Sequence, residues 1–461
     1  MDSKLKILVL YDEAATQTAT VIEHLQAFQL HSAGPVFFAR AVRGAPLAVD
    51  LACFDLVIVH YSVRLTFPAF ISAEYAAALA AYQGLKVLFI QDEYEATEQS
   101  RKWMEKLGFQ LVFTCVPQQY VEEIYPRARF PNTHFVTTLT GFVPDRFEKP
   151  MATRPLRERQ TVLAYRGRAL PYWYGVMGQD KQNIGVKMRE LCNQRGVPCD
   201  IEWDDKKRIY GEAWYEFVGG ARATLGTESG ANVFDFHGEI RRSIEAELAK
   251  NPSFSFEEAS ARFLAAHEGR VRMNQVSPRI FEAVALKTAL VLFEGEYSGV
   301  VQPWTHYLPL KKDFSNADEI FAKLSDLDGL QAMVDRAFQD VIESRRFSYG
   351  AAVSGYTEEW SKRLRARASK TPVGIVVGAS RPRQALETRV IEEVGQIGDY
   401  ATTEPLSYQE AQRPLTHVVP PSREFARAAW KILPGKVRSV IRPVLPGVRP
   451  WLKRMWKPGQ E

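Results

Sequence analysis

The sequence predicts an α/β protein built from two Rossmann-like domains that face each other across a cleft, with an inserted helical hairpin and a basic C-terminal tail. Three observations support this fold class. Short apolar runs alternate with helix-like segments over the first 150 residues, the same pattern restarts after a charged stretch, and the composition changes after about residue 369. The chain has 461 residues, which is long for one hydrophobic core, and its apolar content of 46% is ordinary for a folded protein.

Six largely apolar runs in the N-terminal part are expected to form strands that are covered on both faces. They span residues 5–10, 36–42, 55–60, 85–90, 109–113 and 135–139, and helix-like segments at 15–28, 71–82 and 98–107 lie between them. Alternating strands and helices form right-handed βαβ units and therefore a parallel sheet. Residues 1–150 are predicted to form the first Rossmann-like domain.

The charged stretch 148–160 has poor periodicity and is predicted to link the two domains. Beyond it, strands are expected at 161–165, 200–203, 221–225 and 289–293, and helices at 181–195, from 281 onward, and at 318–324, 330–344 and 356–366. Two helix-like segments around Asn251-Pro252 interrupt the pattern at about 237–268, which predicts an inserted hairpin. Residues 151–369 are predicted to form the second Rossmann-like domain.

Residues 370–461 form a Pro/Arg-rich tail in which the alternation of strands and helices fades. Residues 423–461 carry ten basic and two acidic side chains, with Trp430, Trp451 and Trp456 among them. Basic residues interleaved with Trp and Leu suit the surface of an anionic membrane, and a solvated extension is the alternative. Residues 421–461 are therefore a candidate membrane-surface segment.

The N-terminal sequence lacks the basic region and long apolar core of a signal peptide, and no run approaches 18 apolar residues. The four cysteines show no CxxC spacing, so free thiols in a reducing compartment are expected. We expect a cytoplasmic protein, which would lie on the inner face of the plasma membrane if the tail binds there.

Cationic and small residues follow the strands of the second domain, where open α/β sheets bind ligands. The run Arg166-Gly167-Arg168 ends its first strand, and Lys181 follows after a loop. Cations at a strand end neutralise a diphosphate, and glycine lets the backbone approach it; a basic surface loop is the alternative. After the strand at 221–225 come Thr227, Glu228 and Ser229, which either meet phosphate and sugar or form an ordinary turn.

The segment from Ser277 opens a helix, with Pro278 suited to its first position. Arg279 and Glu282 lie in its first turns. Glu282 either complements the helix dipole or accepts hydrogen bonds from ribose hydroxyls.

The run SPRIFEAVALKTALVLFEGEYSG at 277–299, followed by HYLPLKKDFSN, resembles the donor-binding half of bacterial GT-B glycosyltransferases. The most similar pattern is that of the "glycosyl transferases group 1" (family 1/4-like) proteins of polysaccharide biosynthesis clusters. The resemblance implies a nucleotide-sugar donor bound by the second domain. It implies that Glu282 binds the ribose and that Arg168 and Lys181 bind the diphosphate, with residues 294–298 near the donor.

The sequence departs from this pattern at several positions, and the specific resemblance covers about residues 160–345. The family places another glutamate eight residues before the ribose-binding one, where this chain has Asn274; Glu228 and Ser229 are candidates for its role. Lys287-Thr288 stands where glycine is frequent. The implied activity is transfer of a hexosyl or related sugar (EC 2.4) to a glycan or lipid-linked acceptor in cell-surface polysaccharide biosynthesis. A noncatalytic scaffold with a degenerate donor site is the alternative.

The first domain would then bind the acceptor. Its strand ends offer Asp12, His60-Tyr61 and Asp92-Glu93-Tyr94. An inverting reaction requires a base for the attacking hydroxyl, and Asp92 and His60 are the catalytic candidates. A helix N-cap for Asp92 and a hydrogen-bonded strand-end residue for His60 are the alternatives, and a retaining reaction needs no such base.

Neither a metal nor another cofactor is expected. The only DxD sequence, Asp326-Leu327-Asp328, lies in a helical segment far from the expected site, and side-chain cations can stabilise a leaving diphosphate instead. The sequence has no GxGxxG after either first strand and no GxxxxGK[ST], which excludes ordinary dinucleotide and P-loop sites. Because the net charge is only +5, a nucleic-acid partner is not expected.

Overall fold

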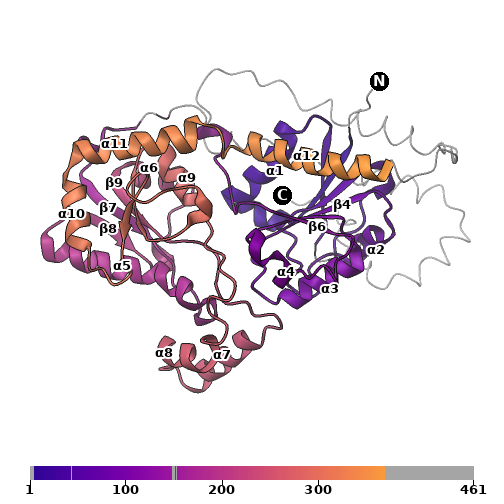
Figure 1. The fold of residues 1–461 in the computed structure, drawn as a ribbon, viewed down its shortest axis with the longest axis horizontal. Coiled ribbons are helices and arrows are strands. Elements are labelled where there is room, and N and C mark those ends of the chain that lie inside the picture. Colours follow the sequence, from indigo (N-terminus) through magenta and orange to yellow (C-terminus); the bar gives the residue numbers. More distant parts are fainter. Residues whose placement is uncertain (1–4, 43, 148–150, 152, 369–461) are drawn as a thin grey trace, which may run out of the picture.

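The structure, a computed structural model, describes residues 5–42, 44–147, 151 and 153–368 of the chain. They form two α/β domains, each built on one parallel sheet, with a helical hairpin projecting at the lower edge (Figure 1). The GT-B fold is therefore confirmed in its main feature, the pair of parallel-sheet domains. The predicted tail 370–461, including the candidate membrane segment 421–461, lies outside the described residues.

The N-terminal sheet has six parallel strands in the order β2-β1-β3-β4-β5-β6. The strands are β1 Ile7–Tyr11, β2 Val36–Arg40, β3 Leu56–Val59, β4 Leu85–Ile90, β5 Leu111–Thr114 and β6 His134–Thr137. The helices of this domain are α1 Ala19–His31, α2 Ala73–Ala81, α3 Thr97–Leu107 and α4 Val121–Ile124. Strands β1, β3, β4 and β5 are buried along their whole length, which is the arrangement that the continuous apolar runs predict.

The C-terminal sheet has five parallel strands in the order β11-β10-β9-β7-β8. The strands are β7 Thr161–Arg166, β8 Cys199–Glu202, β9 Ala221–Gly226, β10 Ala289–Phe293 and β11 Leu308–Leu310. The helices are α5 Gly175–Arg195, α6 Glu212–Gly219, α9 Pro278–Ala285, α10 Ala317–Ser325 and α11 Leu327–Phe338. The predicted strands are confirmed. Strand β11 and helix α6 were not predicted, and α5 begins six residues before the predicted start.

Both sheets have the same winding, because the strand order reverses next to the first strand of each domain. In the C-terminal domain this reversal lies between β7 and β9, and in the N-terminal domain it lies between β1 and β3. Open α/β sheets bind ligands outside the carboxyl ends of the strands at this point. A ligand site is therefore expected at the residues that follow β7 and β9.

The inserted hairpin consists of α7 Glu239–Lys250, α8 Phe256–Ala259 and a π-helical turn, Ser260–Leu264. A capping box between Ser255 and Glu258 begins α8, and a small core of its own packs against Tyr172 and Trp173. The predicted pair of helices around Asn251-Pro252 is confirmed (Figure 1).

The last described helix, α12 Tyr349–Ala368, begins seven residues before its predicted start and packs on the N-terminal domain. Tyr349, Val353, Tyr356 and Trp360 join the core beneath β1, β3 and β4. Although α12 falls within the range 151–369, it therefore stabilises the first domain and ties the two domains together (Figure 1). None of the described helices is both long enough and apolar enough to cross a bilayer.

Candidate donor-binding site

A pocket of about 190 Å³ lies at the carboxyl ends of β7, β9 and β10, at the point where the strand order reverses. Helix α9 begins on one side of it, and α5 and α6 contribute the other walls. The residues that line it are Tyr165, Gly167, Arg168, Lys181, Trp214, Val218, Thr224, Leu225, Gly226, Thr227, Ser277, Arg279, Ile280, Ala283, Leu290 and Leu292. Its floor is apolar and its polar groups come from strand ends and the start of α9, as in ligand pockets generally.

Three cationic side chains line this pocket: Arg168, Lys181 and Arg279. The Lys181 ammonium donates to the Glu228 carbonyl oxygen at 2.9 Å, and the Arg279 guanidinium donates to the Arg166 carbonyl oxygen at 2.6 Å. Burial lowers the pKa of Lys181 to about 8, and the charges of Arg279 and Arg168 act in the same direction. The cations repel one another, so an anion placed among them would be bound favourably.

Gly167 makes the approach of β7 to α5 possible. A Cβ at this position would lie 2.8 Å from the Lys181 carbonyl oxygen and 2.7 Å from the Tyr165 ring. The Tyr165 hydroxyl donates to the same carbonyl oxygen at 2.7 Å. Gly167 and Tyr165 therefore hold the backbone of Lys181 close to the end of β7, which fixes the origin of the lysine side chain.

Small and hydroxyl residues complete the polar rim. Thr227 is buried and lines the pocket beside Gly226, and the Thr227 hydroxyl donates to the Glu228 carbonyl oxygen at 3.2 Å. Ser277 is the N-cap of α9, and its side chain makes no capping hydrogen bond. The start of this helix therefore presents a hydroxyl and first-turn N–H groups beside the three cations, a combination that suits an anionic ligand.

Arg166 is not part of the pocket, contrary to its predicted role in donor binding. Its guanidinium lies 2.8 Å from an Asp200 carboxylate oxygen, donates to the Lys207 carbonyl oxygen at 3.1 Å and covers the Phe217 ring at 4.2 Å. These contacts fix the side chain against strand β8. Only the Arg166 carbonyl oxygen, which accepts from Arg279, contributes to the site.

Glu282 lies beside the pocket and does not line it in this conformation. The carboxylate is 7% exposed and accepts a hydrogen bond of 2.7 Å from the indole N–H of Trp214, which does line the pocket. Burial raises the pKa of Glu282, while the Trp214 hydrogen bond and the Arg279 charge oppose this. The Trp214 indole is therefore the group that joins Glu282 to the pocket lining.

Glu228 and Ser229 hold the rim together through contacts outside the pocket lining. The Glu228 carboxylate accepts from the backbone N–H groups of Glu296 and Tyr297 at 2.7 and 3.0 Å. Ser229 exchanges two backbone hydrogen bonds with Gln275. Glu228 thus joins the loop after β9 to the predicted donor loop 294–298, and the Asn274 side chain donates to Glu296 at 3.0 Å.

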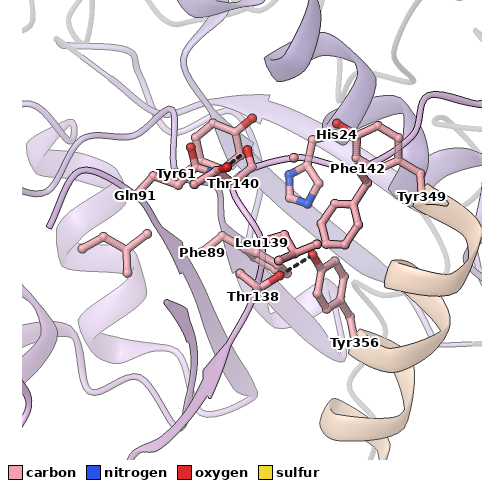
Figure 2. A pocket seen from close by; sticks show the side chains of 12 residues that line it. His24, Tyr61, Phe89, Gln91, Thr138, Leu139, Thr140, Phe142, Tyr349 and Tyr356 are labelled. Atoms are coloured by element: carbon pink, nitrogen blue, oxygen red, sulfur yellow. Dashed lines mark hydrogen bonds between the residues drawn. The ribbon is translucent and has the colours of Figure 1, made fainter. Parts of the chain in front are cut away.

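His60 is buried, and the structure does not support its predicted role as a base. It is 0% exposed, and its ring nitrogens lie 2.9 Å from His24 Nδ1 and 2.9 Å from Ser62 Oγ. Burial lowers the pKa of His60 well below its ordinary value, and His24 acts in the same direction. The adjacent cavity, where His24 and Tyr61 lie close to Tyr349 and Tyr356, measures about 10 Å³ and has room for about one water molecule (Figure 2).

Asp92 is accessible at the end of β4, and its role as a base stays a prediction. It follows β4 with a left-handed backbone (φ 56°), and its side chain is 49% exposed. The Tyr94 hydroxyl donates to Asp92 Oδ1 at 2.7 Å, and Arg64 lies 3.8 Å from Oδ2. A strained conformation at a strand end is frequent at functional sites. The proposed N-cap role does not apply, because α3 begins after Ala96.

Sequence reasoning missed Trp214, Ser277 and Tyr165 as lining residues of the pocket. Trp214 lies on α6, which was not predicted because its helical pattern extends over only eight residues. Among the described residues, no group of three or more His, Cys, Asp or Glu side chains could hold a metal ion.

No protein-family model and no curated protein matches the sequence. An α-glucosyltransferase in complex with UDP and a DNA 13-mer aligns with 78% of this chain and 99% of its own, with 10% identity and a TM-score of 0.45. HepE from Anabaena in complex with UDP covers 78% and 100%, with 13% identity and a TM-score of 0.42. A sucrose-phosphate synthase from Thermosynechococcus elongatus covers 79% and 100%, with 10% identity and a TM-score of 0.40. Structural similarities at this level say nothing about the substrate of this chain.

Proposed function

We propose that this protein is a glycosyltransferase that binds a nucleotide-sugar in the pocket at the ends of β7, β9 and β10. The sugar would pass to a glycan or lipid-linked acceptor in cell-surface polysaccharide biosynthesis. The observation that supports this best is the convergence of Arg168, Lys181 and Arg279 at the point where the strand order reverses. Three cations beside a helix N-terminus match the charge of a diphosphate.

In the proposed reaction, the bond between the anomeric carbon and the diphosphate oxygen breaks while an acceptor hydroxyl attacks the anomeric carbon. Negative charge then develops on the leaving diphosphate. Lys181 and the two arginines stabilise that charge from fixed positions, and we propose that they do so without a metal ion. Because Lys181 is partly buried, its interaction with the diphosphate is weakened less by water than that of a fully exposed lysine.

The nucleoside would lie against Trp214, with its ribose hydroxyls replacing the indole N–H as partners of Glu282. The Trp214 ring centroid already lies 4.7 Å from the guanidinium carbon of Arg279, which lines the same pocket. Because Trp214 lies on α6 and Glu282 on α9, movement of the indole would expose the Glu282 carboxylate without any change in α9.

If the reaction inverts the anomeric centre, Asp92 is the proposed base. It would accept the proton of the attacking hydroxyl, and its half-exposed carboxylate is open to an acceptor. A contact of its own loop supports this proposal: a Cβ at Gly230, in the loop after β9, would lie 3.9 Å from the ring of Tyr94, whose hydroxyl donates to Asp92.

Calorimetric titration with UDP, GDP, CDP, CMP and TDP and their common sugars tests the proposal. We expect saturable binding of one nucleotide, weakened by Lys181→Met. Lys187→Met is the matched control, because Lys187 lies on the same helix, is 43% exposed and pairs with Glu190 outside the pocket. Equal nucleotide binding by both variants would show that the nucleotide does not contact Lys181. No binding by the wild-type protein would favour the noncatalytic scaffold.

A further inference from the structure

A second and larger hollow, of about 360 Å³, lies between the N-terminal domain and the segments that flank the inserted hairpin. We call it the hairpin groove and define it by Phe67, Tyr94, Lys102, Trp173, Phe236 and Arg242. Phe67 and Lys102 belong to the N-terminal domain, while Arg242 lies on α7 of the hairpin. The groove is therefore formed jointly by the N-terminal domain and the first helix of the inserted hairpin.

The hairpin groove lies close to the loop that follows β9. Tyr94 lines the groove, and its ring lies 3.9 Å from the position of a Cβ at Gly230, three residues after the pocket-lining Thr227. The Tyr94 hydroxyl also donates to Asp92. A ligand lying in the groove could therefore extend one end toward the donor and the proposed base.

Aromatic rings form much of the groove. Phe67, Trp173, Tyr174 and Phe236 line it, and each is partly exposed. Pyranose rings have apolar C–H faces that pack against aromatic rings, while their hydroxyls stay hydrated. An arginine guanidinium already lies over Phe67, Trp173 and Phe236, so a sugar ring would pack on the other face of these rings.

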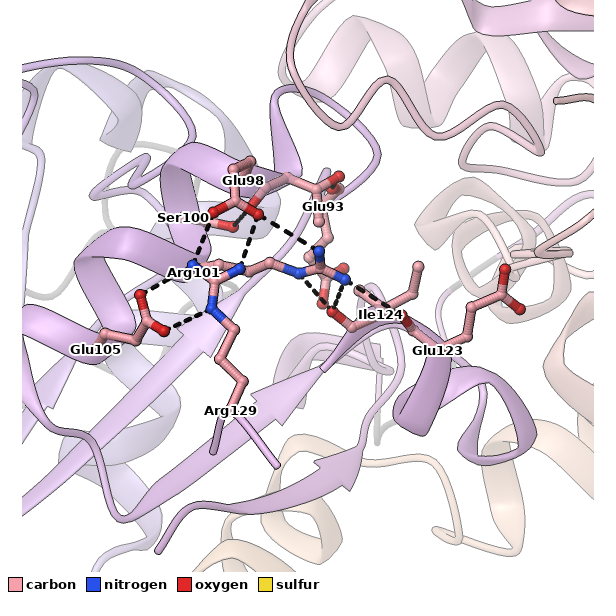
Figure 3. A network of polar contacts seen from close by, with 9 residues as sticks. Glu93, Glu98, Ser100, Arg101, Glu105, Glu123, Ile124 and Arg129 are labelled. Carbon is pink, nitrogen blue, oxygen red and sulfur yellow. Dashed lines mark hydrogen bonds and ion pairs between the residues drawn. The ribbon is translucent and has the colours of Figure 1, made fainter. Parts of the chain in front are cut away.

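The acidic residues of the groove are all occupied within the protein. The Glu98 carboxylate accepts two hydrogen bonds from Arg129 at 2.7 and 2.8 Å and lies 3.4 Å from Arg101 (Figure 3). Glu95 pairs with Arg64 at 3.0 Å. Asp235 accepts from the backbone N–H of Arg241 at 2.9 Å.

Two cations of the groove have no acidic partner among the described residues. Lys102 is exposed on α3, and its side chain makes no hydrogen bond or ion pair with any residue that the structure describes. Arg242 is exposed on α7, and its guanidinium donates a hydrogen bond of 3.1 Å to the His237 carbonyl oxygen. Because Glu95 and Glu98 are paired with arginines, Lys102 and Arg242 are exposed cations of the groove that have no ion-pair partner among the described residues.

We propose that the hairpin groove binds an anionic saccharide, the segment of the acceptor next to the attacking sugar. Its rings pack on Trp173 and Phe236, and its carboxylate or phosphate lies between Lys102 and Arg242. This inference rests on the proposed glycosyl transfer for its role, but the groove binds the saccharide without any nucleotide. The insertion thereby selects acceptors by charge.

The test measures saccharide binding in the absence of nucleotide, by calorimetry. The probes are tetragalacturonate, which carries carboxylates, N-acetylglucosamine 1-phosphate, which stands for a phosphate-linked sugar, and neutral maltotetraose. The full chain is compared with the double variant Lys102→Glu, Arg242→Glu. Lys323→Glu on α10 is the control, because it reverses the charge of one exposed lysine that does not line the groove, as each of the two substitutions does within the groove.

We expect one anionic probe to bind at least about tenfold more tightly than maltotetraose, and the double variant to remove that preference while Lys323→Glu retains it. Preference for tetragalacturonate identifies an acidic glycan, and preference for the phosphosugar identifies a phosphate-linked acceptor. Equal binding of all probes, no binding, or an unchanged double variant overturns the proposal. Nucleotide binding of each variant is measured separately, so failure of the donor site is distinguished from failure of the groove.

Discussion

Lys181 gives the donor pocket a pH dependence that follows from its surroundings. In the free protein, burial together with Arg279 and Arg168 lowers the pKa of Lys181 from 10.5 to about 8. A bound diphosphate places opposite charge next to the ammonium, so binding is expected to return the pKa toward its ordinary value. The protonated form favours binding. Affinity is therefore highest well below pH 8 and falls as the pH rises through 8 toward 10.5.

The size of this effect can be calculated from the two pKa values. With a free pKa of about 8, about nine tenths of Lys181 is charged at pH 7 and about one tenth at pH 9. If the bound pKa is about 10.5, the Kd of a nucleotide-sugar should rise about tenfold between pH 7 and pH 9. At pH 8, binding should take up about half a proton per molecule.

Calorimetry in buffers of different ionisation enthalpy measures both the Kd and the proton uptake. Lys181→Arg is the control, because arginine stays charged over this range and any ionisation of the ligand affects both proteins equally. We expect the tenfold change and the proton uptake in the wild-type protein and neither in the variant. Parallel pH profiles for the two proteins would show that Lys181 does not meet the diphosphate.

Four further outcomes are expected. Arg279→Ala should weaken nucleotide binding by about 10- to 100-fold, because a hydrogen bond to a charged group contributes roughly 1.5–3 kcal/mol. Arg166→Ala should leave the Kd within about threefold and lower the melting temperature instead, because Arg166 is paired with Asp200. Gly167→Ala should cost about 1–3 kcal/mol in urea unfolding, because the new Cβ would meet the Lys181 carbonyl oxygen; an unchanged midpoint would contradict this contact. Asp92→Asn should reduce sugar transfer by about 10²-fold or more with little change in nucleotide Kd, provided the product shows inversion; full activity would remove Asp92 as the base. Transfer should persist in EDTA, and complete loss that Mg²⁺ restores would show that the cations alone do not support the reaction.

The strands were predictable because most of them are buried on both faces and therefore appear as continuous apolar runs. Strand β4, Leu85–Ile90, and strand β10, Ala289–Phe293, have the predicted bounds. Strand β11 was missed because it is only three residues long and contains Pro309. Its pairing with β10 depends on the three-dimensional sheet and leaves little trace in a sequence this short.

The site was predictable where it depends on strand ends and unpredictable where it depends on long-range contacts. Arg168 and Lys181, which follow β7, line the pocket, and their role in binding a diphosphate stays a prediction. Arg166 is next to them in sequence, but its orientation depends on Asp200 of the neighbouring strand. His60 is buried, and one of its ring nitrogens is paired with His24, which lies 36 residues away in sequence on α1. Such pairings follow from tertiary packing, which a single sequence does not state.

The hairpin groove shows the same limit. The helices of the insertion were predictable from their pattern, yet the groove also needs Phe67 and Lys102 from the other domain. The charge of the groove depends on whether Glu98 is free or paired. Glu98 is paired with Arg129, which lies in a loop 31 residues away in sequence. A list of aromatic and basic residues could not have supplied that information.

A crystal structure of the protein with the nucleotide-sugar that it binds most tightly would locate the donor. We predict that the diphosphate lies at the carboxyl ends of β7 and β9, within hydrogen-bonding distance of Lys181 Nζ and the Arg279 guanidinium. We also predict that the Trp214 indole has left Glu282 and that a ribose hydroxyl has taken its place. A nucleotide bound outside this pocket, or a diphosphate that touches neither Lys181 nor Arg279, would contradict it.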